Sequence, residues 1–559
     1  MRGLGIRGLV CLMIAFTLPF SLAPGINSVS AETIVPGGSV SGTWTVSGSP
    51  YLIQGNINVP ADSTLTIEPG VQVSFQGGYG LTVNGLLEAV GTEADSIRFT
   101  AVSWWNGVTF NNAVDVSHVS YTSFSGESAT LACDNSSPEI SHCRISGGLY
   151  GILVTDLGRP NLAHCTISDN YRGIFWQGSA SGIISDCVIA GNATHGGGWA
   201  QHADTLTFVD CMFDGNTASP TTGGGAFCSL GSFLIFSRCT FTNNETTSMS
   251  GLGGAVSCIN AGATFTDCTF RGNISNCGTN CGGGAVGLSS SDATFTRCTL
   301  SENGAARGGA IEVADGSSYA LDHCTVDGIF WGYGTLASDG SSSARIENSI
   351  VANSPYGAAI YAEGALEVDH TAFFNNYWDV YGSIPPGFGD LIQTNANGDS
   401  CDVYYNIFMD PLYVNQPGGD FHLQAESPCI DAGDPADPPD PDGTVPDMGA
   451  FAFYQGTAVP RIVWPITLEK RLSAARPNPF RECTEIRYTL DAATPVHMAI
   501  FDIQGRLVTT LLDGIGEAGT HPAVWDGTDE AGIAVMPGIY FVRLEAEGFA
   551  DTRTVLLLR

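Results

Sequence analysis

The chain has 559 residues, and its charge is sparse and one-sided, with 21 Lys and Arg against 55 Asp and Glu. This balance excludes a general electrostatic grip on nucleic acid and disfavours binding to an anionic membrane surface. Glycine is frequent, at 71 residues, but has no three-residue period, which excludes collagen, and an apolar content of 43% is too high for a disordered chain.

Residues 1–31 are predicted to be a secretory signal peptide. Arg2 and Arg7 form a basic start, LVCLMIAFTLPF at 9–20 is an apolar core, and small residues lead up to a cleavage point after Ala31. No later stretch reaches about 18 consecutive apolar residues, so no transmembrane span is expected. The predicted location is extracellular, either secreted or on the outer-membrane surface.

Residues 32–110 are expected to form the start and cap of a solenoid. LTIEPGVQVSF (65–75), LTVNGLLEAVGT (81–92) and SIRFTA (96–101) have the alternation of strands and are separated by glycine turns. An open coil end exposes backbone edges, so this end needs a cover.

A repeat dominates residues 111–400, which are predicted to form regular coils. One cysteine recurs at steps of 22 to 30 residues, at Cys143, Cys165, Cys187, Cys211, Cys239, Cys268, Cys298 and Cys324. Thr122 is expected to occupy the same slot one repeat earlier, and Asn348 and His370 to continue it. Steps this short favour a solenoid over a propeller, whose blades need about 40 residues.

An asparagine follows most of these slots by five residues, at Asn170, Asn192, Asn216, Asn244, Asn273 and Asn303, then at Asn353 and Asn375. Runs of Thr, Val, Phe and Ile between the turns are typical of strands. Each repeat is therefore predicted to be one coil of a parallel β-helix, whose equivalent residues stack about 4.8 Å apart. Cysteine would fill a narrow interior, and each asparagine amide would bond to the next.

The cysteines could alternatively form disulfides or bind metal. Because Thr, Asn and His share their slot and no CxxC pair occurs, a structural ladder is the preferred interpretation. Cys277 and Cys281, in an inserted loop, are a separate candidate disulfide. Cys401 and Cys429 are another, which would close the chain around the end of the solenoid.

That end is predicted at residues 401–453. The segment DPADPPDPDG offers oxygen ligands for a candidate calcium site, at Asp434, Asp437, Asp440 and Asp442. The alternative is a solvated cluster of turns. No other cofactor is expected.

A linker is expected at 454–471, and the repeats vanish from residues 472–559. EIRYTL, VHMAIFDIQGRLVTTLL, HPAVWDG, GIYFVRLEA and TRTVLLLR are predicted strands at short spacing, as in a small antiparallel sandwich. The predicted fold class is therefore all-β, a parallel β-helix followed by a small β-sandwich.

Two resemblances add to this interpretation. The repeats CTFTNN…GGAV and CTLSEN…GGAI resemble those of right-handed parallel β-helix proteins of the pectin-lyase-like superfamily, especially polymorphic outer-membrane proteins. RPNPF (476–480), AIFDIQGRLV (499–508), WDGTDEAG (525–532) and GIYFVRL (538–544) resemble the FlgD-like immunoglobulin-like domain and the type IX secretion sorting domain of Bacteroidota-related bacteria.

The first resemblance implies right-handed coils over 32–453. The second implies an Ig-like tail over 472–559, with the type IX secretion machinery as a partner and with tail cleavage or surface attachment. The tail departs from many sorting domains because it keeps the FlgD-like WDG loop.

Many β-helix proteins act on polysaccharides, and such enzymes need clustered acids or a basic residue on one outward face. Strand alternation predicts an outward column of Leu153, Phe175, Cys228, Ser257, Gly287, Glu312 and Tyr361, in which only Glu312 is charged. The single lysine, Lys470, lies in the linker. No catalytic residue is therefore assigned.

A candidate ligand-binding set comprises Asp169, Arg172, Trp176, Trp199, His202 and Glu312. Its tryptophans could stack on sugar rings and its charged groups could bond hydroxyls, although Trp176 has inward parity. The preferred interpretation is a non-catalytic structural or adhesive surface protein that binds extracellular polysaccharide or a host or cell-surface ligand. The alternative is a polysaccharide lyase, a glycoside hydrolase or a carbohydrate-binding protein.

Overall fold

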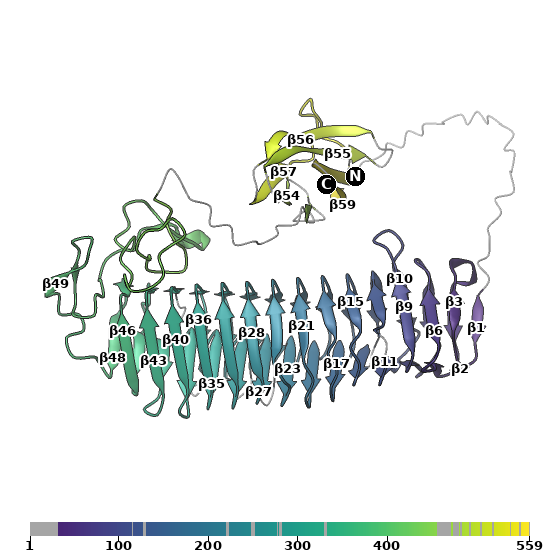
Figure 1. Cartoon of the computed structure of the whole chain (residues 1–559), viewed down its shortest axis with the longest axis horizontal. Coiled ribbons are helices and arrows are strands. Elements are labelled where there is room, and N and C mark those ends of the chain that lie inside the picture. The colour runs from purple at the N-terminus through teal and green to yellow at the C-terminus, as the bar shows by residue number, and fades with distance from the viewer. Residues whose placement is uncertain are drawn as a thin grey trace, which may run out of the picture. The chain divides into compact units, whose positions relative to one another are not determined.

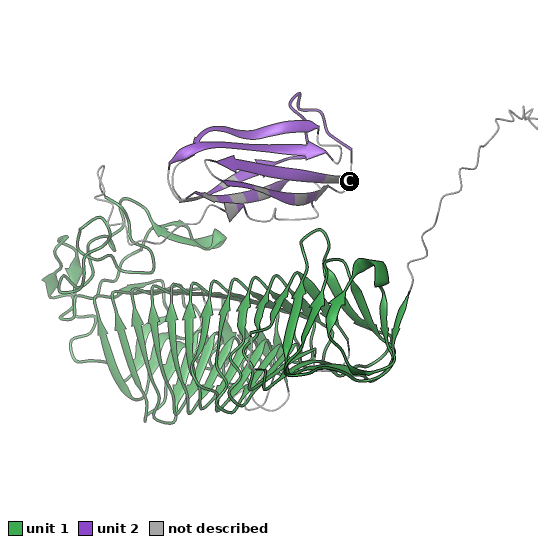
Figure 2. Cartoon of the chain, turned by 45° about the vertical axis from the view of Figure 1, so that its right-hand side comes forward, with its two compact units in different colours: residues 1–457 green, residues 458–559 purple. Residues whose placement is uncertain are grey.

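The structure is a computed structural model, and it divides into two compact units, residues 1–457 and 458–559 (Figure 2). It describes residues 32–113, 116–126, 130–219, 223–247, 252–276, 278, 282–328, 332–455, 471–472, 480, 483–490, 493–502, 506–516, 519–536, 538–546 and 549–557. The predicted signal peptide and Cys277 and Cys281 lie outside these residues.

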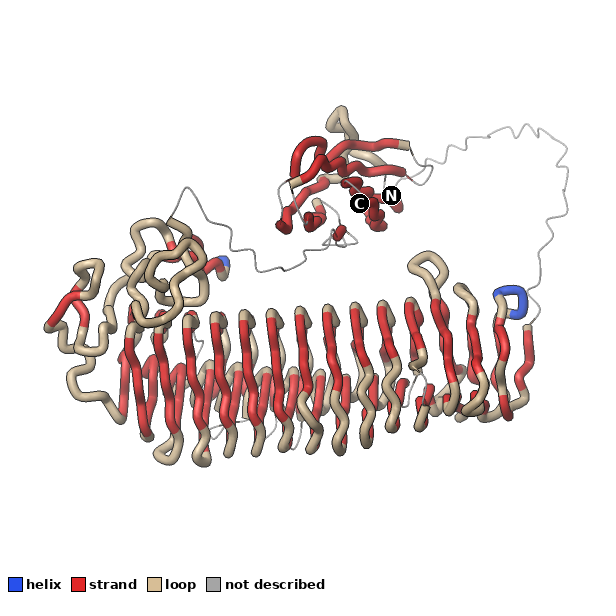
Figure 3. The backbone as a smooth tube through the Cα atoms, viewed as in Figure 1, coloured by secondary structure: helices blue, strands red, loops and turns tan. Residues whose placement is uncertain are grey.

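The first unit is a solenoid of three parallel sheets, to which each coil contributes one short strand per sheet (Figures 1 and 3). Sheet A has 15 strands, from β1 (Thr33–Val35) to β47 (Ala372–Phe374), and sheet C has 14, from β3 (Gly42–Trp44) to β46 (Ala365–Asp369). Sheet B, which carries the candidate site, has 15 strands: β2 (Gly38–Ser39), β5 (Ile57–Val59), β8 (Gly80–Val83), β11 (Gly107–Asn111), β14 (Leu131–Asp134), β17 (Ile152–Thr155), β20 (Ile174–Gln177), β23 (Gly198–Gln201), β27 (Phe227–Leu230), β31 (Val256–Ile259), β35 (Val286–Ser289), β39 (Ile311–Ala314), β42 (Gly334–Ser338), β45 (Ala358–Ala362) and β48 (Trp378–Gly382). This is the predicted parallel β-helix.

The core is a column of apolar side chains enclosed by the three sheets. Alternate residues of each strand point inward, so the same residue type stacks on itself from coil to coil. The rings of Phe236 and Phe265 are stacked at 5.2 Å and 2°, and those of Phe241 and Phe270 at 4.6 Å and 3°. Identical stacking of this kind fixes the register, because a slip of one residue would turn every inward side chain outward.

A buried asparagine ladder runs along one corner of the coils. Its members are at most 2% exposed: Asn170, Asn192, Asn216, Asn244, Asn273 and Asn303. Each Nδ2 donates to Oδ1 of the asparagine in the next coil at 2.9–3.1 Å, as far as Asn303. The same Nδ2 donates to a main-chain carbonyl of the preceding coil, so both amide hydrogens are used.

The repeated cysteines form a second buried column of free thiols. Cys239 is representative: its Sγ donates to the carbonyl of Ser237 at 3.4 Å and to that of Phe208, in the preceding coil, at 3.5 Å. The thiols therefore act as small apolar fillers with weak donors.

The cysteine slot continues one residue later than the sequence suggested. Thr325 pairs with Ile350, and Ile350 pairs with Ala372, so the slot after Cys324 is filled by Ser349 and Thr371. The prediction that Asn348 and His370 fill it was wrong. The coil after Cys324 has one residue more than the sequence spacing suggested, so the slot falls on Ser349 instead of Asn348. By the same shift Asn353 and Asn375 lie at left-handed corners, with φ of 57° and 52°.

A fourth, short sheet supplements coils in the middle of the solenoid. Its strands are β26 (Thr217–Ala218), β30 (Glu245–Thr246), β34 (Ile274–Ser275) and β38 (Gly304–Ala305). The Gly-Gly-Ala segments that follow in the chain fold back against it, and a Cβ on Gly254 would lie 2.6 Å from the backbone nitrogen of Ile274. Glycine is required here for close approach of two backbones.

The C-terminal segment of this unit both covers the coil end and packs along one side. Phe388 and Phe408 lie against Phe373 at the end of the core, with centroids 5.3 and 5.6 Å away. The later part, with β51 (Tyr413–Asn415) and β52 (Asp420–Leu423), packs on the outer face of sheet A. The segment 401–453 was predicted as an end closure, but much of it covers the side of the last coils.

The second unit contains two antiparallel sheets. One comprises β53 (Arg471–Leu472), β54 (Thr484–Leu490) and β57 (Gly519–Trp525), and the other β56 (Leu507–Gly516), β55 (Thr494–Asp502), β58 (Gly538–Ala546) and β59 (Phe549–Leu557). A buried cluster that includes Ile500, Trp525 and Val542 lies in this unit. The predicted small antiparallel domain is confirmed.

In the described part of the chain, the helices are the short η1 (Val46–Gly48) and η2 (Gln416–Gly418), and none is long and apolar enough to cross a membrane.

Candidate binding surface

The outer face of sheet B is exposed at its two ends and covered in its middle. The register stacks Leu153, Phe175, Trp199, Cys228, Ser257, Gly287, Glu312, Ala337, Tyr361 and Tyr381 in one outward column. Cys228 and Ser257 are nevertheless fully buried, whereas Tyr381 is 50% exposed. The predicted outward column is therefore correct in parity but only partly reaches solvent.

Glycine-rich loops cover the middle of this face. A Cβ on Gly224 would lie 2.7 Å from the nitrogen of Ser257, and a Cβ on Gly253 would lie 2.9 Å from that of Gly287. The loops can lie this close to the sheet because neither has a side chain at the point of contact.

Glu312 is sealed beneath one of these loops. A Cβ on Gly282 would lie 0.8 Å from its Oε2, and the residue is 6% exposed. Its Oε1 lies 3.4 Å from Nε of Arg307, while Oε2 has no hydrogen-bond partner among the described residues. Burial raises the pKa of Glu312, and Arg307 partly offsets that rise. The prediction of Glu312 as a surface ligand group was wrong, because a loop covers it.

An arginine surrounded by aromatic rings lies at the open, N-terminal part of the face. Arg172 donates from Nη1 to the hydroxyl of Tyr150 at 2.7 Å, and its guanidinium lies 5.0 Å from that ring and 5.8 Å from the ring of Phe175. Phe175 meets Trp199 edge to face at 6.4 Å, and Trp199 contacts His195 at 4.7 Å. We call these five residues the Arg172 cluster; all five are half-buried.

The hydrogen bonds of the cluster fix the tautomer of His195. Nη2 of Arg172 lies 3.3 Å from Nε2 of His195, and since arginine can only donate, Nε2 accepts and the proton sits on Nδ1. Burial, followed by the charge of Arg172, lowers the pKa of His195 to about 4, so the ring is neutral at pH 7. Nε of Arg172, Nδ1 of His195 and Nε1 of Trp199 have no hydrogen-bond partner among the described residues.

The six residues predicted as a ligand site are mostly not brought together. Arg172 and Trp199 belong to the Arg172 cluster. Trp176 is fully buried and packs on Phe208 and Phe227, so its prediction as a sugar platform was wrong. Asp169 and His202 are exposed at left-handed corners outside the sheet B strands. Tyr150, which the sequence analysis missed, follows the Gly-Gly turn in the coil before Arg172, and this repeat position was the available signal.

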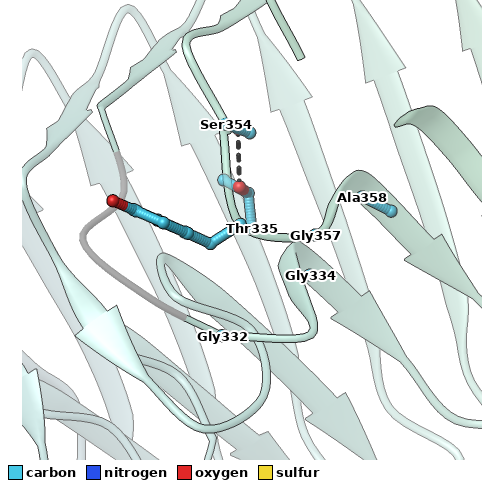
Figure 4. A pocket seen from close by; sticks show the side chains of 7 residues that line it. Gly332, Gly334, Thr335, Ser354, Gly357 and Ala358 are labelled. Atoms are coloured by element: carbon cyan, nitrogen blue, oxygen red, sulfur yellow. Dashed lines mark hydrogen bonds between the residues drawn. The ribbon is translucent and has the colours of Figure 1, made fainter. Parts of the chain in front are cut away.

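A second aromatic group lies at the C-terminal end of the same face. Tyr361 and Tyr381 stack at 5.5 Å, and Trp378 lies 5.5 Å from Tyr381. Trp378 is 52% exposed. Beside this group, Thr335 and Ser354 share a hydrogen bond of 2.7 Å in a cavity of about 10 Å³ (Figure 4). That cavity has room for one water molecule.

The candidate calcium site and the candidate Cys401–Cys429 disulfide do not form as predicted. The carboxylates of the DPADPPDPDG segment are engaged in local contacts: Asp434 with the nitrogen of Ala436, Asp437 with Asn348, Asp440 with the nitrogen of Asp447, and Asp442 with Thr444. In the described part of the chain no group of three or more His, Cys, Asp or Glu side chains could hold a metal ion. Cys401 and Cys429 are free thiols buried in one apolar cluster with Met448, so the structure contains no bond between them.

Comparison with known proteins identifies both units. The protein family described as "Right handed beta helix region" matches residues 106–270 and 249–408. The family described as "FlgD Ig-like domain" matches residues 482–548. The protein bark beetle of Drosophila melanogaster is 40% identical over 81 residues, which are 14% of this chain and 3% of that protein. This chain therefore spans a very small part of that relative.

Two solved structures resemble this chain weakly. An alginate lyase from Paenibacillus sp. str. FPU-7 has 12% identity and a TM-score of 0.17, over 54% of this chain and 92% of that one. A mutant tailspike protein of E. coli bacteriophage HK620, in complex with a hexasaccharide, has 10% identity and a TM-score of 0.23, over 93% of this chain and 86% of that one. TM-scores this low carry no argument about activity.

Proposed function

The chain belongs to the family of proteins with a right-handed β-helix region, and on this premise we propose that it is an exported, non-catalytic binding protein of the cell surface. Its solenoid serves as a rigid support, and the Arg172 cluster is the binding surface. The ligand class we propose is extracellular polysaccharide or a cell-surface glycan. The FlgD Ig-like domain at the C-terminal end is proposed to deliver the protein through the type IX secretion machinery.

The observation that carries this proposal is the chemistry of the outer face of sheet B. Its open part presents aromatic rings around one guanidinium, which suits stacking and hydrogen bonding to a sugar. The acidic residue of the outward column, Glu312, is covered and paired with Arg307. A column with ring faces and donors, whose one acid is covered, supports binding more than hydrolysis.

Binding should depend on the Arg172 cluster. We expect Arg172→Ala and Trp199→Ala each to weaken glycan binding about tenfold or more, since each removes a stacking or charged contact of roughly 1–2 kcal/mol. The measurement is a glycan array followed by titration calorimetry on the best ligand. Phe233→Ala is the matched control, because Phe233 is an exposed aromatic residue of sheet C, 44% exposed. Equal binding by all variants would contradict the proposal.

A polysaccharide-active enzyme is the second candidate, because Tyr150 is hydrogen-bonded to Arg172 on the open face and tyrosine is one of the side chains that can transfer a proton in catalysis. His195 is a poor base, since its pKa is lowered to about 4 and its Nε2 already accepts a hydrogen bond from Arg172. The test is a screen for reducing sugars and unsaturated products over a polysaccharide panel, with and without Ca²⁺. Turnover that is lost in Tyr150→Phe or Arg172→Ala would replace the binding proposal with this one.

Removal of residues 472–559 should leave the protein in the periplasm. The expected result follows from the proposed role of the FlgD Ig-like domain as the sorting signal. Cell fractionation and protease accessibility on whole cells measure it, with the full-length chain as the control. Surface display of the truncated protein would show that sorting information lies elsewhere.

A further inference from the structure

The first coil of the solenoid consists of three strands that have a neighbour on one side only. β1 pairs with β4 (Tyr51–Ile53), β2 with β5 and β3 with β6 (Thr64–Ile67), and no strand in the described part of the chain pairs with their other edges (Figure 1). An unpaired edge exposes backbone donors and acceptors that can pair with another chain. The N-terminal end of the solenoid is therefore a surface on which strands can dock.

The hydrogen bonds of β1 show which of its backbone groups face this open end. The nitrogen of Thr33 donates to the carbonyl of Pro50 at 3.0 Å, and the carbonyl of Val35 accepts from the nitrogen of Gln54 at 2.8 Å. Both bonds point into the next coil. Because alternate residues of a strand direct their N–H and C=O groups to opposite edges, those of Ile34 point to the open end.

The same alternation applies to β2. Gly38 and Val40 each donate from nitrogen to the next coil at 2.8 Å, so the backbone groups of Ser39 between them face the open end. Ile34 is 60% exposed and Ser39 is also exposed. Each strand thus offers solvent an outward N–H and C=O beside an uncharged side chain.

The opposite end of the solenoid is covered. There the nitrogen of Phe373 in β47 donates to the carbonyl of Ile407 at 2.8 Å, and the ring of Phe408 stacks on that of Phe373. At the first coil, by contrast, the apolar side chains of Val35 and Val40 pack on the core but are only partly buried. Head-to-tail stacking of two solenoids would require a free C-terminal end, so only two N-terminal ends can meet.

The first coil is uncharged, although the chain has a formal net charge of −34. Residues 33–61 contain no Asp, Glu, Lys, Arg or His. Glu32 precedes them, and the predicted cleavage after Ala31 would give it a compensating α-amino group. Edge strands commonly carry charged side chains that prevent association. Two copies of an acidic chain repel each other, and the repulsion is smallest where neither copy is charged.

We propose that the first coil is a docking surface for a second copy of this chain, which gives a dimer with the two N-terminal ends in contact. A twofold axis perpendicular to the solenoid places β1 antiparallel to its own copy, so that Ile34 can exchange both of its backbone hydrogen bonds across the axis. Such a contact is closed and stops at two copies. It is independent of the glycan-binding proposal.

The test is sedimentation velocity of the exported chain, with an untagged N-terminal end, over a range of concentrations. The parent should form dimers. Ile34→Asp should weaken dimerisation at least about tenfold, because it removes apolar area from the contact and sets like charges opposite each other. Ser39→Asp, at an exposed residue outside the core, should act in the same direction.

Ile183→Asp is the matched control. Ile183 is 57% exposed, close to the value for Ile34, but its strand β21 (Gly182–Ser185) is paired on both sides, with β18 (Asn161–Ala163) and β24 (Leu206–Val209). This variant should dimerise as the parent does. Circular dichroism confirms that each variant is folded. Unchanged dimerisation in folded Ile34→Asp and Ser39→Asp, or assembly beyond two copies, would overturn the proposal.

Hydrogen exchange identifies what covers the first coil. The amides of Ile34 and Ser39 should be protected in the dimer and should exchange faster on dilution and in Ile34→Asp. A monomeric parent with these amides protected would assign the cover to another segment of the same chain. A monomeric parent in which they exchange freely would show an end without a cover. Either result contradicts docking of a second copy.

Discussion

Replacing Asn244 by aspartate should lower the free energy of unfolding of the β-helix by about 3–5 kcal/mol, although the two side chains have nearly the same size. Asn244 is fully buried in the middle of the asparagine ladder. Its Nδ2 donates to Oδ1 of Asn273 at 2.9 Å and to the carbonyl of Phe213 at 2.9 Å. Aspartate would place oxygen and negative charge against both acceptors, and it has no hydrogen to donate when ionised.

The measurement is urea unfolding followed by circular dichroism. Asn276→Asp is the matched control: it makes the same chemical change one coil away, at an exposed residue whose Nδ2 lies 3.2 Å from Oε1 of Glu245. There the loss should stay within about 1 kcal/mol, since solvent screens the new charge. Similar losses in both variants would show that the ladder bonds contribute little to stability.

The ladders show which features of a solenoid are readable from its sequence. Every coil meets only its neighbours, so a residue whose role is to stack on its own copy must recur at each step. The spacing of Cys239, Cys268 and Asn244, Asn273 therefore revealed the coil, its strands and its buried columns. The reading failed at Asn348 and His370, where a coil longer by one residue moved polar residues from the inward slot to the left-handed corner.

Exposure could not be predicted in the same way. Alternation placed Glu312 outward correctly, but it could not show that Gly282 lies on top of it. Covering depends on the path of an inserted loop, and a loop leaves no periodic pattern. The Arg172 cluster was found only in part for a related reason, because its contacts join residues from three coils.

The Gly-Gly-Ala segments are a third case. Their repeated glycines were visible in the sequence, but the physical reason for them was not. Their glycines suggested turns and strand ends. The structure gives a stricter reason: a Cβ on Gly254 would lie 2.2 Å from the carbonyl oxygen of Gly284 in the next coil and 2.6 Å from the nitrogen of Ile274 in β34. Gly225 and Gly284 are confined by backbone in the same way. The segment is glycine because two backbones leave no room for a methyl group.

Gly254→Ala should therefore lower the free energy of unfolding by about 3 kcal/mol or more. The overlapping atoms belong to main chain on two sides, so no side-chain rotation can relieve the contact, and either the coil spacing or the pairing of β34 must change. Thermal unfolding and hydrogen exchange at the amides of Ile274 and Ser275 measure the effect. Gly340→Ala is the control, since a Cβ there meets no atom within 4 Å and its φ is not positive. Unchanged stability and unchanged amide protection in Gly254→Ala would mean that the coils are spaced more loosely than the structure places them. Close approach of two backbones would then not explain why the Gly-Gly-Ala segment recurs.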